Sequence, residues 1–424
     1  MAELSLSPPI VLRRGSAPPA LFNVCLVLLV LTLLHFPLAW LSHSWIYDAN
    51  GLGNPTDFVN VWAAGKLALE GHAVQAWDWQ VQKQVEVAVL GQDFAGYFAW
   101  HYPPPFLFVA AFLAQFPYAA AFAGWALASM LPYLALMRAI VGRAFGIMLA
   151  IAFPATFDNL AIGQNGFLTT SLIGGTLYLM PRRPVLAGIC LGLLTYKPQY
   201  GLLFPLALIA GRQWRVFVSA ALTSLSVALA ATIAFGVESW AAFFHWMPMI
   251  SKAVLSEGAE SWLRLQSVFA MVRCLGGGGE ALAWTLQAVA ACIVAIGLVL
   301  MWRSRVPYAL KAAALATGTL LCSPYTYMYD FAVLALPVAW LVRVGYEDGF
   351  RPYEPYALGF VLALLASFPF LKIPVGLAAT LIVAALIIAR AVAASREVSA
   401  SESGLAPNLA RSTCLAHFQS CHPL

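Results

Sequence analysis

The sequence predicts an all-α, polytopic membrane protein, and three observations support this fold class. Hydrophobic residues make up 62% of the 424 residues, and charged residues only 10%, against roughly 25% charged in an average soluble domain. A core of ordinary size cannot bury so much apolar surface, so lipid must cover part of it. Apolar runs of about 20 residues, the length that crosses a bilayer, also recur along the chain. The repetition predicts a helical bundle rather than an anchored globule.

The first apolar run, Leu21 to Leu41, follows Arg13 and Arg14 and has the outline of a secretory signal. It is longer than the apolar part of a signal peptide, and no small-residue cleavage site follows it. We therefore expect it to be the first transmembrane helix, preceded by a cytoplasmic N-terminus.

Basic residues predict the orientation of the bundle. They gather in short loops between apolar runs, and the positive-inside rule places those loops on the cytoplasmic side. The net charge of +5 thus indicates orientation and does not predict nucleic-acid binding. The clusters are Arg13/Arg14, Arg138/Arg143, Arg182/Arg183, Arg212/Arg215, Arg303/Arg305 and Arg343.

The spacing of apolar segments predicts eleven to thirteen spans, each of them helical. One stretch, 104–137, stays unassigned because Pro117 splits it while the flanking charges require an odd number of crossings. The expected segments are 21–41, 104–137, 144–157, 166–180, 185–195, 200–211, 216–235, 281–302, 308–322, 331–345, 355–371 and 374–394. The predicted regions are a cytoplasmic N-terminus (1–20), a transmembrane domain (21–394) with its first extracytoplasmic loop (42–103), and a disordered tail (395–424).

The first outward loop is the most informative stretch, with six acidic residues against two lysines. Within it Phe58, Trp62, Gly65 and Leu69 recur at helical spacing and predict a short amphipathic helix along the membrane surface. Asp57 directly precedes this helix. Either Thr56 or Asp57 is simply the N-cap of this helix, or the Asp57 carboxylate is a general base near the interface, and the two interpretations are compatible.

Outward-facing chemistry has no nucleotide supply, so an enzyme there must take its activated group from a lipid carrier. Glycosyl transfer from a polyprenyl phosphate meets this condition. It needs a carboxylate that deprotonates an acceptor hydroxyl, for which Asp57 is the candidate, and a cation that holds the leaving phosphate. Lys197, in LLTYKPQYGLL between two apolar segments, is the candidate cation. The alternative is a lysine that snorkels to lipid headgroups.

Further candidates follow from position in other outward loops. The amides in DNLAIGQNG, a motif that begins at Asp158, suit sugar hydroxyls, although a polar turn also explains them. Tyrosines in SPYTYMYDF suit either an interfacial belt or stacking on a sugar. The resulting substrate-binding candidates are Gln164, Asn165, His101, Tyr327 and Asp330. No cofactor or metal is predicted, because the spacing of Cys414, His417, Cys421 and His422 matches no standard zinc site.

Five ordered blocks of the sequence resemble glycosyltransferase family 87, which is related to polyprenol-phosphate-mannose-dependent mannosyltransferases. The blocks are TDFVNVWAAGKLALEGHAVQAWD, FAWHYPPPFLF, IGQNGFLTTSLIGGTLYL, RRPVLAGICLGLLTYKPQYGLLFPLALIAGRQWR and SPYTYMYDFAVLALP. The resemblance implies a GT-C type fold with the catalytic carboxylate in the first outward loop, matched here by Asp57. It also implies a polyprenyl-phosphate sugar donor and inversion at the anomeric carbon. The end of the chain from Ala400 does not resemble the family.

The sequence thus predicts a hexosyltransferase of a bacterial cytoplasmic membrane. It would move a hexose, with mannose as one candidate, from a polyprenyl phosphate to a glycolipid or glycan acceptor on the extracytoplasmic face. The main alternative is a transporter or lipid flippase, in which Lys197 and the proline-broken helices would form a translocation path. A third is a structural subunit of the envelope. The long first loop favours the enzyme, which needs a platform beside the bilayer.

Overall fold

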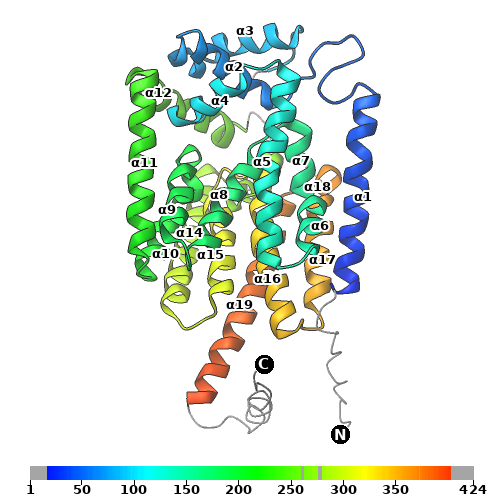
Figure 1. Cartoon of the computed structure of the whole chain (residues 1–424), viewed down its shortest axis with the longest axis vertical. Coiled ribbons are helices and arrows are strands. Elements are labelled where there is room, and N and C mark those ends of the chain that lie inside the picture. The colour runs from blue at the N-terminus through cyan, green and yellow to red at the C-terminus, as the bar shows by residue number, and fades with distance from the viewer. Residues whose placement is uncertain (1–16, 97, 259–261, 276–278, 372, 403–424) are drawn as a thin grey trace, which may run out of the picture.

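The structure is a computed structural model, and it describes residues 17–96, 98–258, 262–275, 279–371 and 373–402. Helices dominate these residues, as the sequence predicts, and the named strand pairing is limited to the isolated bridges Tyr47–Gly53 and Leu265–Tyr327. The helices form an upright bundle with a layer of shorter helices across one end (Figure 1).

Six helical segments in the described residues are long and apolar enough to cross a membrane. They are α1 (Pro19–Leu41), α5 (Tyr118–Val141), α11 (Trp214–Phe235), α14 (Glu280–Arg303), the continuous pair η7 (Met328–Leu334) and α16 (Ala335–Asp348), and α19 (Val375–Glu402). A seventh is the pair α6 (Phe145–Ala152) and α7 (Pro154–Ile162), which bends by 59°. Pro154 explains this bend, because it lacks the N–H that would continue the first helix.

Five of the shorter apolar helices lie between these long segments along the chain. They are α8 (Gly166–Leu179), α9 (Pro184–Leu193), α10 (Phe204–Ala210), α15 (Tyr308–Cys322) and α17 (Glu354–Ala366). By length and apolarity the described residues contain six spans, or seven with the bent pair, against the predicted eleven to thirteen. The start of α1 and the end of α19 lie at the same end of the bundle (Figure 1).

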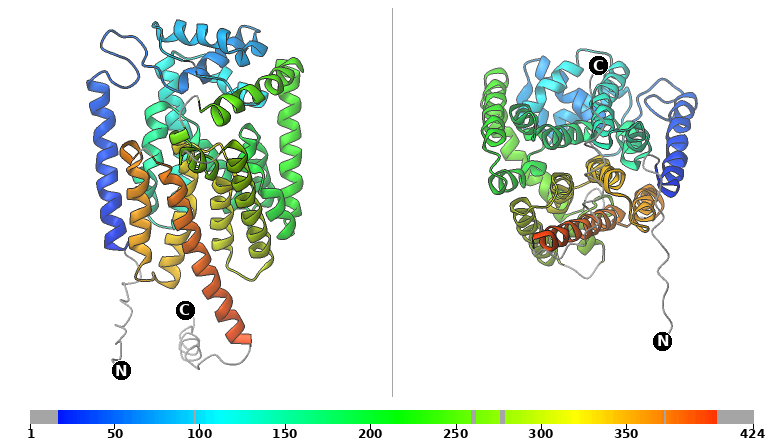
Figure 2. Two further views of the ribbon diagram at one scale, coloured as in Figure 1. Left: turned by 180° about the vertical axis from the view of Figure 1, so that it is seen from behind. Right: turned by 60° about the horizontal axis from the view of Figure 1, so that its bottom comes forward.

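Burial separates a central segment from a peripheral ring. The η7–α16 segment is the centre, since 94% of its most apolar window is buried, against 11% for α14 and 17% for both α1 and α11. Leucines such as Leu222, Leu225 and Leu229 therefore stand exposed along α11, where lipid would cover them. Figure 2 shows α1 and α11 at opposite edges of the bundle.

The unassigned stretch 104–137 makes one crossing. Its first part forms η2 (Pro104–Phe106) and α4 (Leu107–Leu113), which lie in the end layer, and α5 begins directly after Pro117. Pro117 has the extended conformation (ψ 144°) that ends one segment and starts the next. The first outward segment is therefore longer than the predicted 42–103 and reaches α5.

The end layer contains the predicted helix after Asp57, which is α2 (Phe58–Leu69), followed by η1 (Ala73–Trp77) and α3 (Trp79–Leu90). Eight residues of α2 are buried, and Gly65 packs so closely on α4 that a Cβ there would lie 2.0 Å from the Ala110 carbonyl oxygen. The apolar face of α2 thus packs on protein rather than on the predicted membrane surface.

A second outward segment follows α11. It comprises α12 (Glu238–Ser251), the π-turn η5 (Lys252–Ser256), η6 (Trp262–Arg264) and α13 (Val268–Cys274), with its own small core around Leu265 and Phe269. Two hydrogen bonds fasten it to the loop before η7: Gln266 N donates to the Thr326 carbonyl (2.8 Å), and Ser267 Oγ to the Pro324 carbonyl (2.8 Å).

At the other end of the chain α19 continues to Glu402, into the segment that the sequence predicted to be disordered. Residues 403–424, with the four cysteine and histidine residues of the tail, lie outside the described residues. A short α18 (Phe368–Leu371) closes the outward end of α17.

Candidate active site

A cavity of about 930 Å³ lies where the end layer meets the outward ends of the bundle. Its walls come from α2, the loop before η2, α7, the second outward segment and η7. The polar and aromatic lining residues are Thr56, Asp57, Asn60, Trp79, Phe98, His101, Asp158, Gln164, Arg264, Tyr325, Tyr327, Tyr329 and Phe368. Four of the seven predicted site residues, Asp57, His101, Gln164 and Tyr327, therefore line one cavity.

Asp57 stands at the N-cap position of α2, but its side chain does not cap the helix. Its backbone is already helical (φ −57°, ψ −25°), and no side-chain cap hydrogen bond forms. Instead Gln164 Nε2 donates a hydrogen bond to Asp57 Oδ2 at 2.7 Å, across 107 residues of sequence. Of the two interpretations of Asp57, the structure excludes the N-cap and leaves the carboxylate at the cavity wall.

The turn between α7 and α8 places Gln164. Gly163 ends α7 in the left-handed region (φ +68°), and an added Cβ would lie 2.7 Å from both Phe58 and Phe122. Only glycine fits this conformation and this space. The next residue, Gln164, is buried, and its Oε1 accepts from the Asn165 N–H at 3.2 Å. Both ends of the Gln164 amide are thereby fixed, which aims Nε2 at Asp57.

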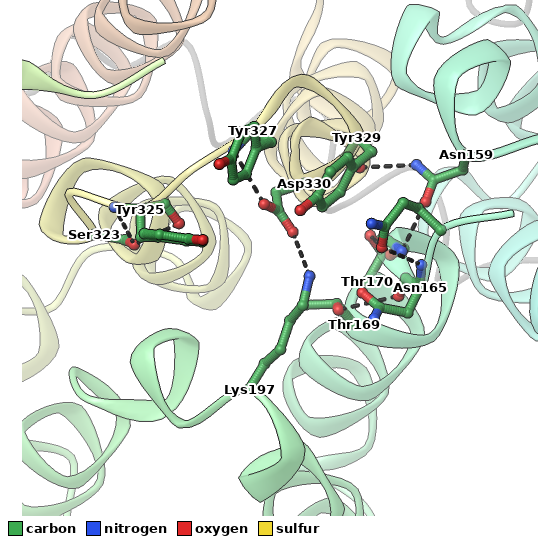
Figure 3. A network of polar contacts seen from close by, with 12 residues as sticks. Asn159, Asn165, Thr169, Thr170, Lys197, Ser323, Tyr325, Tyr327, Tyr329 and Asp330 are labelled. Atoms are coloured by element: carbon green, nitrogen blue, oxygen red, sulfur yellow. Dashed lines mark hydrogen bonds and ion pairs between the residues drawn. The ribbon is translucent and has the colours of Figure 1, made fainter. Parts of the chain in front are cut away.

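Asn165 lies behind the cavity and does not line it. Its Nδ2 donates to the Tyr102 hydroxyl at 2.6 Å, and its carbonyl accepts from Thr169 Oγ1 at 3.1 Å. Asn159 holds the same region together, because its side chain bonds both the Gly166 N–H and the Tyr329 carbonyl (Figure 3). Asn165 therefore packs behind the cavity in this structure, and its contact with a sugar stays a prediction.

Lys197 and Asp330 form a buried ion pair with 2.7 Å between Nζ and Oδ1. Lys197 lies in the break between η3 (Leu194–Tyr196) and η4 (Pro198–Gly201), where Pro198 interrupts the helix. Only 5% of its side chain is exposed, so the snorkelling interpretation is wrong. Asp330 Oδ2 also accepts from the Tyr327 N–H at 3.1 Å, which ties the pair to the start of η7.

The ion pair sits behind the cavity wall. Neither Lys197 nor Asp330 lines the cavity, and Tyr329, which does line it, has its ring centroid 5.0 Å from Lys197 Nζ. Figure 3 shows Lys197 directed at Asp330, with Tyr327 and Tyr329 beside that carboxylate. The pair therefore supports the tyrosine wall from behind, which is a different position from the predicted direct contact with a phosphate.

Three tyrosines form one wall of the cavity. The rings of Tyr327 and Tyr329 stack with centroids 5.4 Å apart at 16°, and Tyr325 meets Tyr327 edge-on at 5.4 Å. This arrangement favours the stacking interpretation over an interfacial belt, because all three residues line the cavity. Flat aromatic faces of this kind suit the apolar face of a sugar ring.

His101 contributes a neutral imidazole. Burial lowers the pKa of His101 to about 4, although its contact with the Ala99 carbonyl opposes this effect. Nδ1 lies 3.0 Å from that carbonyl oxygen. Since a carbonyl only accepts, Nδ1 carries the proton and Nε2 is left as an acceptor.

Two charged lining residues, Asp158 and Arg264, are not among the seven predicted site residues. Asp158 begins the DNLAIGQNG motif, whose amides suit a sugar better, and Arg264 lies in the outward loop 236–279, where residues could meet an acceptor but no pattern fixes their roles. Arg264 is the one guanidinium or ammonium group among the described lining residues. Across the described residues no three His, Cys, Asp or Glu side chains converge as metal ligands do.

Fold and cavity together define a polytopic membrane protein with a polar site at one end. Comparison with family models matches residues 100–324, more than half of the chain, to glycosyltransferase family 87. The chain belongs to this family, and it is a membrane glycosyltransferase. Neither a search of curated proteins nor a search of solved structures found a match to the chain. The matched segment includes Gln164 and Lys197 and leaves Asp57 outside.

Proposed function

We propose that the protein transfers a hexose from a polyprenyl phosphate to a hydroxyl group of a glycolipid or glycan. Mannose is the first sugar to test. The observation that carries this proposal is the Asp57 carboxylate, which Gln164 holds at the wall of a 930 Å³ cavity. A cavity of this size accommodates a sugar with part of its acceptor.

In the proposed reaction Asp57 is the general base. It takes the proton of the acceptor hydroxyl as that oxygen attacks the anomeric carbon. The bond between the anomeric carbon and the phosphate oxygen breaks, and polyprenyl phosphate leaves with the bonding electron pair. Attack from the face opposite the phosphate inverts the anomeric configuration.

Arg264 is better placed than Lys197 to stabilise the leaving phosphate. Arg264 lines the cavity, and a guanidinium can hold a phosphate through two parallel N–H donors. Lys197 already neutralises Asp330 behind the wall. We therefore assign Lys197 and Asp330 to positioning Tyr327 and Tyr329, and Arg264 to the phosphate.

An apolar groove supports a lipid-linked donor. It has a volume of about 560 Å³ and lies between α11, α12 and the broken helix at Pro198. Pro103 lines this groove and His101, two residues earlier, lines the cavity, so a polyprenyl chain in the groove would bring its phosphate close to the site. Apolar side chains such as Leu225, Phe244 and Met247 form its walls.

The membrane orientation belongs to the same proposal. In the described residues, the loops between α5 and α6, α8 and α9, α10 and α11, and α14 and α15 contain arginines and lie at the end opposite the cavity (Figure 1). The positive-inside rule makes that end cytoplasmic. The cavity would then face the outside of a bacterial cytoplasmic membrane, in a GT-C type domain that spans residues 21–394. A donor on a lipid carrier, with no nucleotide, is consistent with this side of the membrane.

The test is sugar transfer by purified protein in lipid nanodiscs. A panel of radiolabelled polyprenyl-phosphate hexoses is offered with lipid extract as acceptor, and nucleotide sugars serve as the comparison donors. Label that enters lipid from a polyprenyl-phosphate hexose alone supports the proposal. Transfer from nucleotide sugars alone would overturn the donor assignment, and an absence of transfer with every donor would favour the transporter.

A further inference from the structure

The cavity contains a second carboxylate that the proposed reaction does not use. Asp158 lies on α7, after the 59° bend, and lines the same cavity as Asp57. No hydrogen bond or ion pair joins its side chain to another residue in the described part of the chain. A half-buried carboxylate at a cavity wall with all its acceptor sites open has a strong tendency to bind a hydrogen-bond donor.

The position of Asp158 is rigid. The next residue, Asn159, is buried and makes hydrogen bonds of 2.7 Å to the Gly166 N–H and 2.8 Å to the Tyr329 carbonyl. These contacts fix α7 against α8 and η7. Asp158 is therefore presented by a fixed helix to the same cavity that Tyr327 and Tyr329 line.

A second open acceptor faces the cavity from α2. Asn60 is 4% exposed, lines the cavity, and has a buried Oδ1 without a hydrogen-bond partner in the described residues. Hydrogen-bond acceptors on two walls of the cavity favour a ligand that has several hydrogen-bond donors. Hydroxyl groups of a sugar ring meet this need, and adjacent hydroxyls can donate to both oxygens of one carboxylate.

A phosphate is a poor partner for Asp158 whenever this carboxyl group is ionised, because two anions at one site repel each other. The cation that suits the phosphate, Arg264, belongs to the second outward segment and not to α7. The tyrosine stack lines the same cavity and offers an apolar face, so the cavity combines polar groups with a flat apolar surface. A sugar ring has the same two components, polar hydroxyl groups and an apolar face.

We propose that Asp158 is the residue that recognises sugar hydroxyl groups in this cavity and so determines which hexose is bound. The inference rests on the proposed function and deepens it. Asp158 acts in recognition, and Asp57 remains the general base. The recognised sugar belongs either to the donor or to the acceptor, since both carry the same hydroxyl chemistry.

Direct binding tests this inference without reference to catalysis. Wild type, Asp158→Asn and Asp158→Ala in nanodiscs are titrated with short alkyl hexosides and with their monodeoxy analogues, and binding is followed by calorimetry. We expect one hexoside to bind wild type, one deoxy position to weaken it about tenfold or more, and Asp158→Ala to lose that difference. The matched control is Glu70→Ala, which removes an exposed carboxylate outside the cavity.

The outcomes are distinct. Equal affinity of wild type and Asp158→Ala for every analogue would overturn the inference, as would the absence of hexoside binding by wild type. Asp158→Asn keeps the shape of the side chain, so it tests the same contact if the alanine variant does not fold. Binding that depends on Asp158 without transfer from any polyprenyl phosphate would support the inference and overturn the proposed reaction. In the transfer assay, a raised KM for donor or acceptor identifies the source of the sugar.

Discussion

Gln164 Nε2 lies 2.7 Å from Asp57 Oδ2 and connects the turn between α7 and α8 to the first residue before α2. This contact orients the carboxylate that we propose as the base. A hydrogen bond to a charged group contributes about 1.5–3 kcal/mol. Its loss is therefore large enough to be visible in the reaction rate.

We predict that Gln164→Ala lowers kcat about 10- to 100-fold in protein that is still folded at the assay temperature, although the loss of this buried hydrogen bond also lowers Tm. The remaining Asp57 carboxylate would still be present but no longer held in one orientation. The matched control is Gln115→Ala, because Gln115 is an exposed amide outside the cavity. A Gln164→Ala enzyme as fast as the control would show that this contact does not orient the base.

The buried pair of Lys197 and Asp330 gives a second prediction. Lys197→Met and Asp330→Asn each leave one buried charge without its partner, which costs about 3–5 kcal/mol. The double variant removes both charges and keeps an oxygen that can accept from the Tyr327 N–H. We expect thermal unfolding in detergent to show two destabilised single variants and a double variant more stable than either.

An exposed pair of equal length is the control for that series. Lys66 and Glu70 are also 2.7 Å apart, but about half of each side chain is exposed. Lys66→Met should change the stability by about 1 kcal/mol or less. If Lys197→Met destabilised the protein by no more than Lys66→Met does, Lys197 would not be a buried charge.

Some of this site could be predicted from the sequence, because helix starts and polar residues between apolar runs are local signals. Asp57 before a helix and Lys197 in a proline-broken run are examples. The pairings could not be predicted, since Lys197 and Asp330 are 133 residues apart and Gln164 and Asp57 are 107 apart. Apolarity alone also cannot separate burial in lipid from burial in protein. For this reason α4 looked like part of a span although it packs on α2.

Gly65 gives a prediction about that packing. An added Cβ would overlap the Ala110 carbonyl oxygen at 2.0 Å, so α2 and α4 would have to separate. Gly65→Ala should destabilise the end layer by about 1–3 kcal/mol and displace Asp57 with α2. Gly124→Ala in α5 meets no atom within 4 Å and serves as the control. Equal Tm and activity in both variants would contradict the close approach of α2 and α4.

Glu86 predicts a pH dependence of stability. It is fully buried on α3, accepts from the Phe98 N–H at 3.3 Å, and has a second oxygen without a partner in the described residues. Burial raises the pKa of Glu86 from 4.5 to about 8, with smaller opposing effects of the Phe98 N–H and Lys83 and a small further rise from Asp57. The folded protein thus retains a proton between these pH values that the unfolded chain releases.

Because the folded state binds more protons in this window, stability falls as the pH rises from about 4.5 to about 8. We expect the Tm of wild type to fall over this range. The Tm of Glu86→Gln should fall less, because glutamine has no proton to release. At pH 8 the variant should therefore melt at least about 3 °C above wild type. Glu70→Gln, at an exposed carboxylate whose partner is Lys66, is the control. Parallel pH profiles of wild type and Glu86→Gln would contradict the raised pKa.

The central claim is that Asp57 is the base of a hexosyl transfer from a polyprenyl phosphate. Its most direct test is the rate of label transfer by wild type and Asp57→Asn, side by side in nanodiscs, with equal Tm as the criterion of folding. Asparagine keeps the shape and the contact with Gln164 but cannot take a proton. We predict transfer by wild type and a loss of at least about 100-fold in Asp57→Asn. Equal rates in the two proteins would contradict the claim.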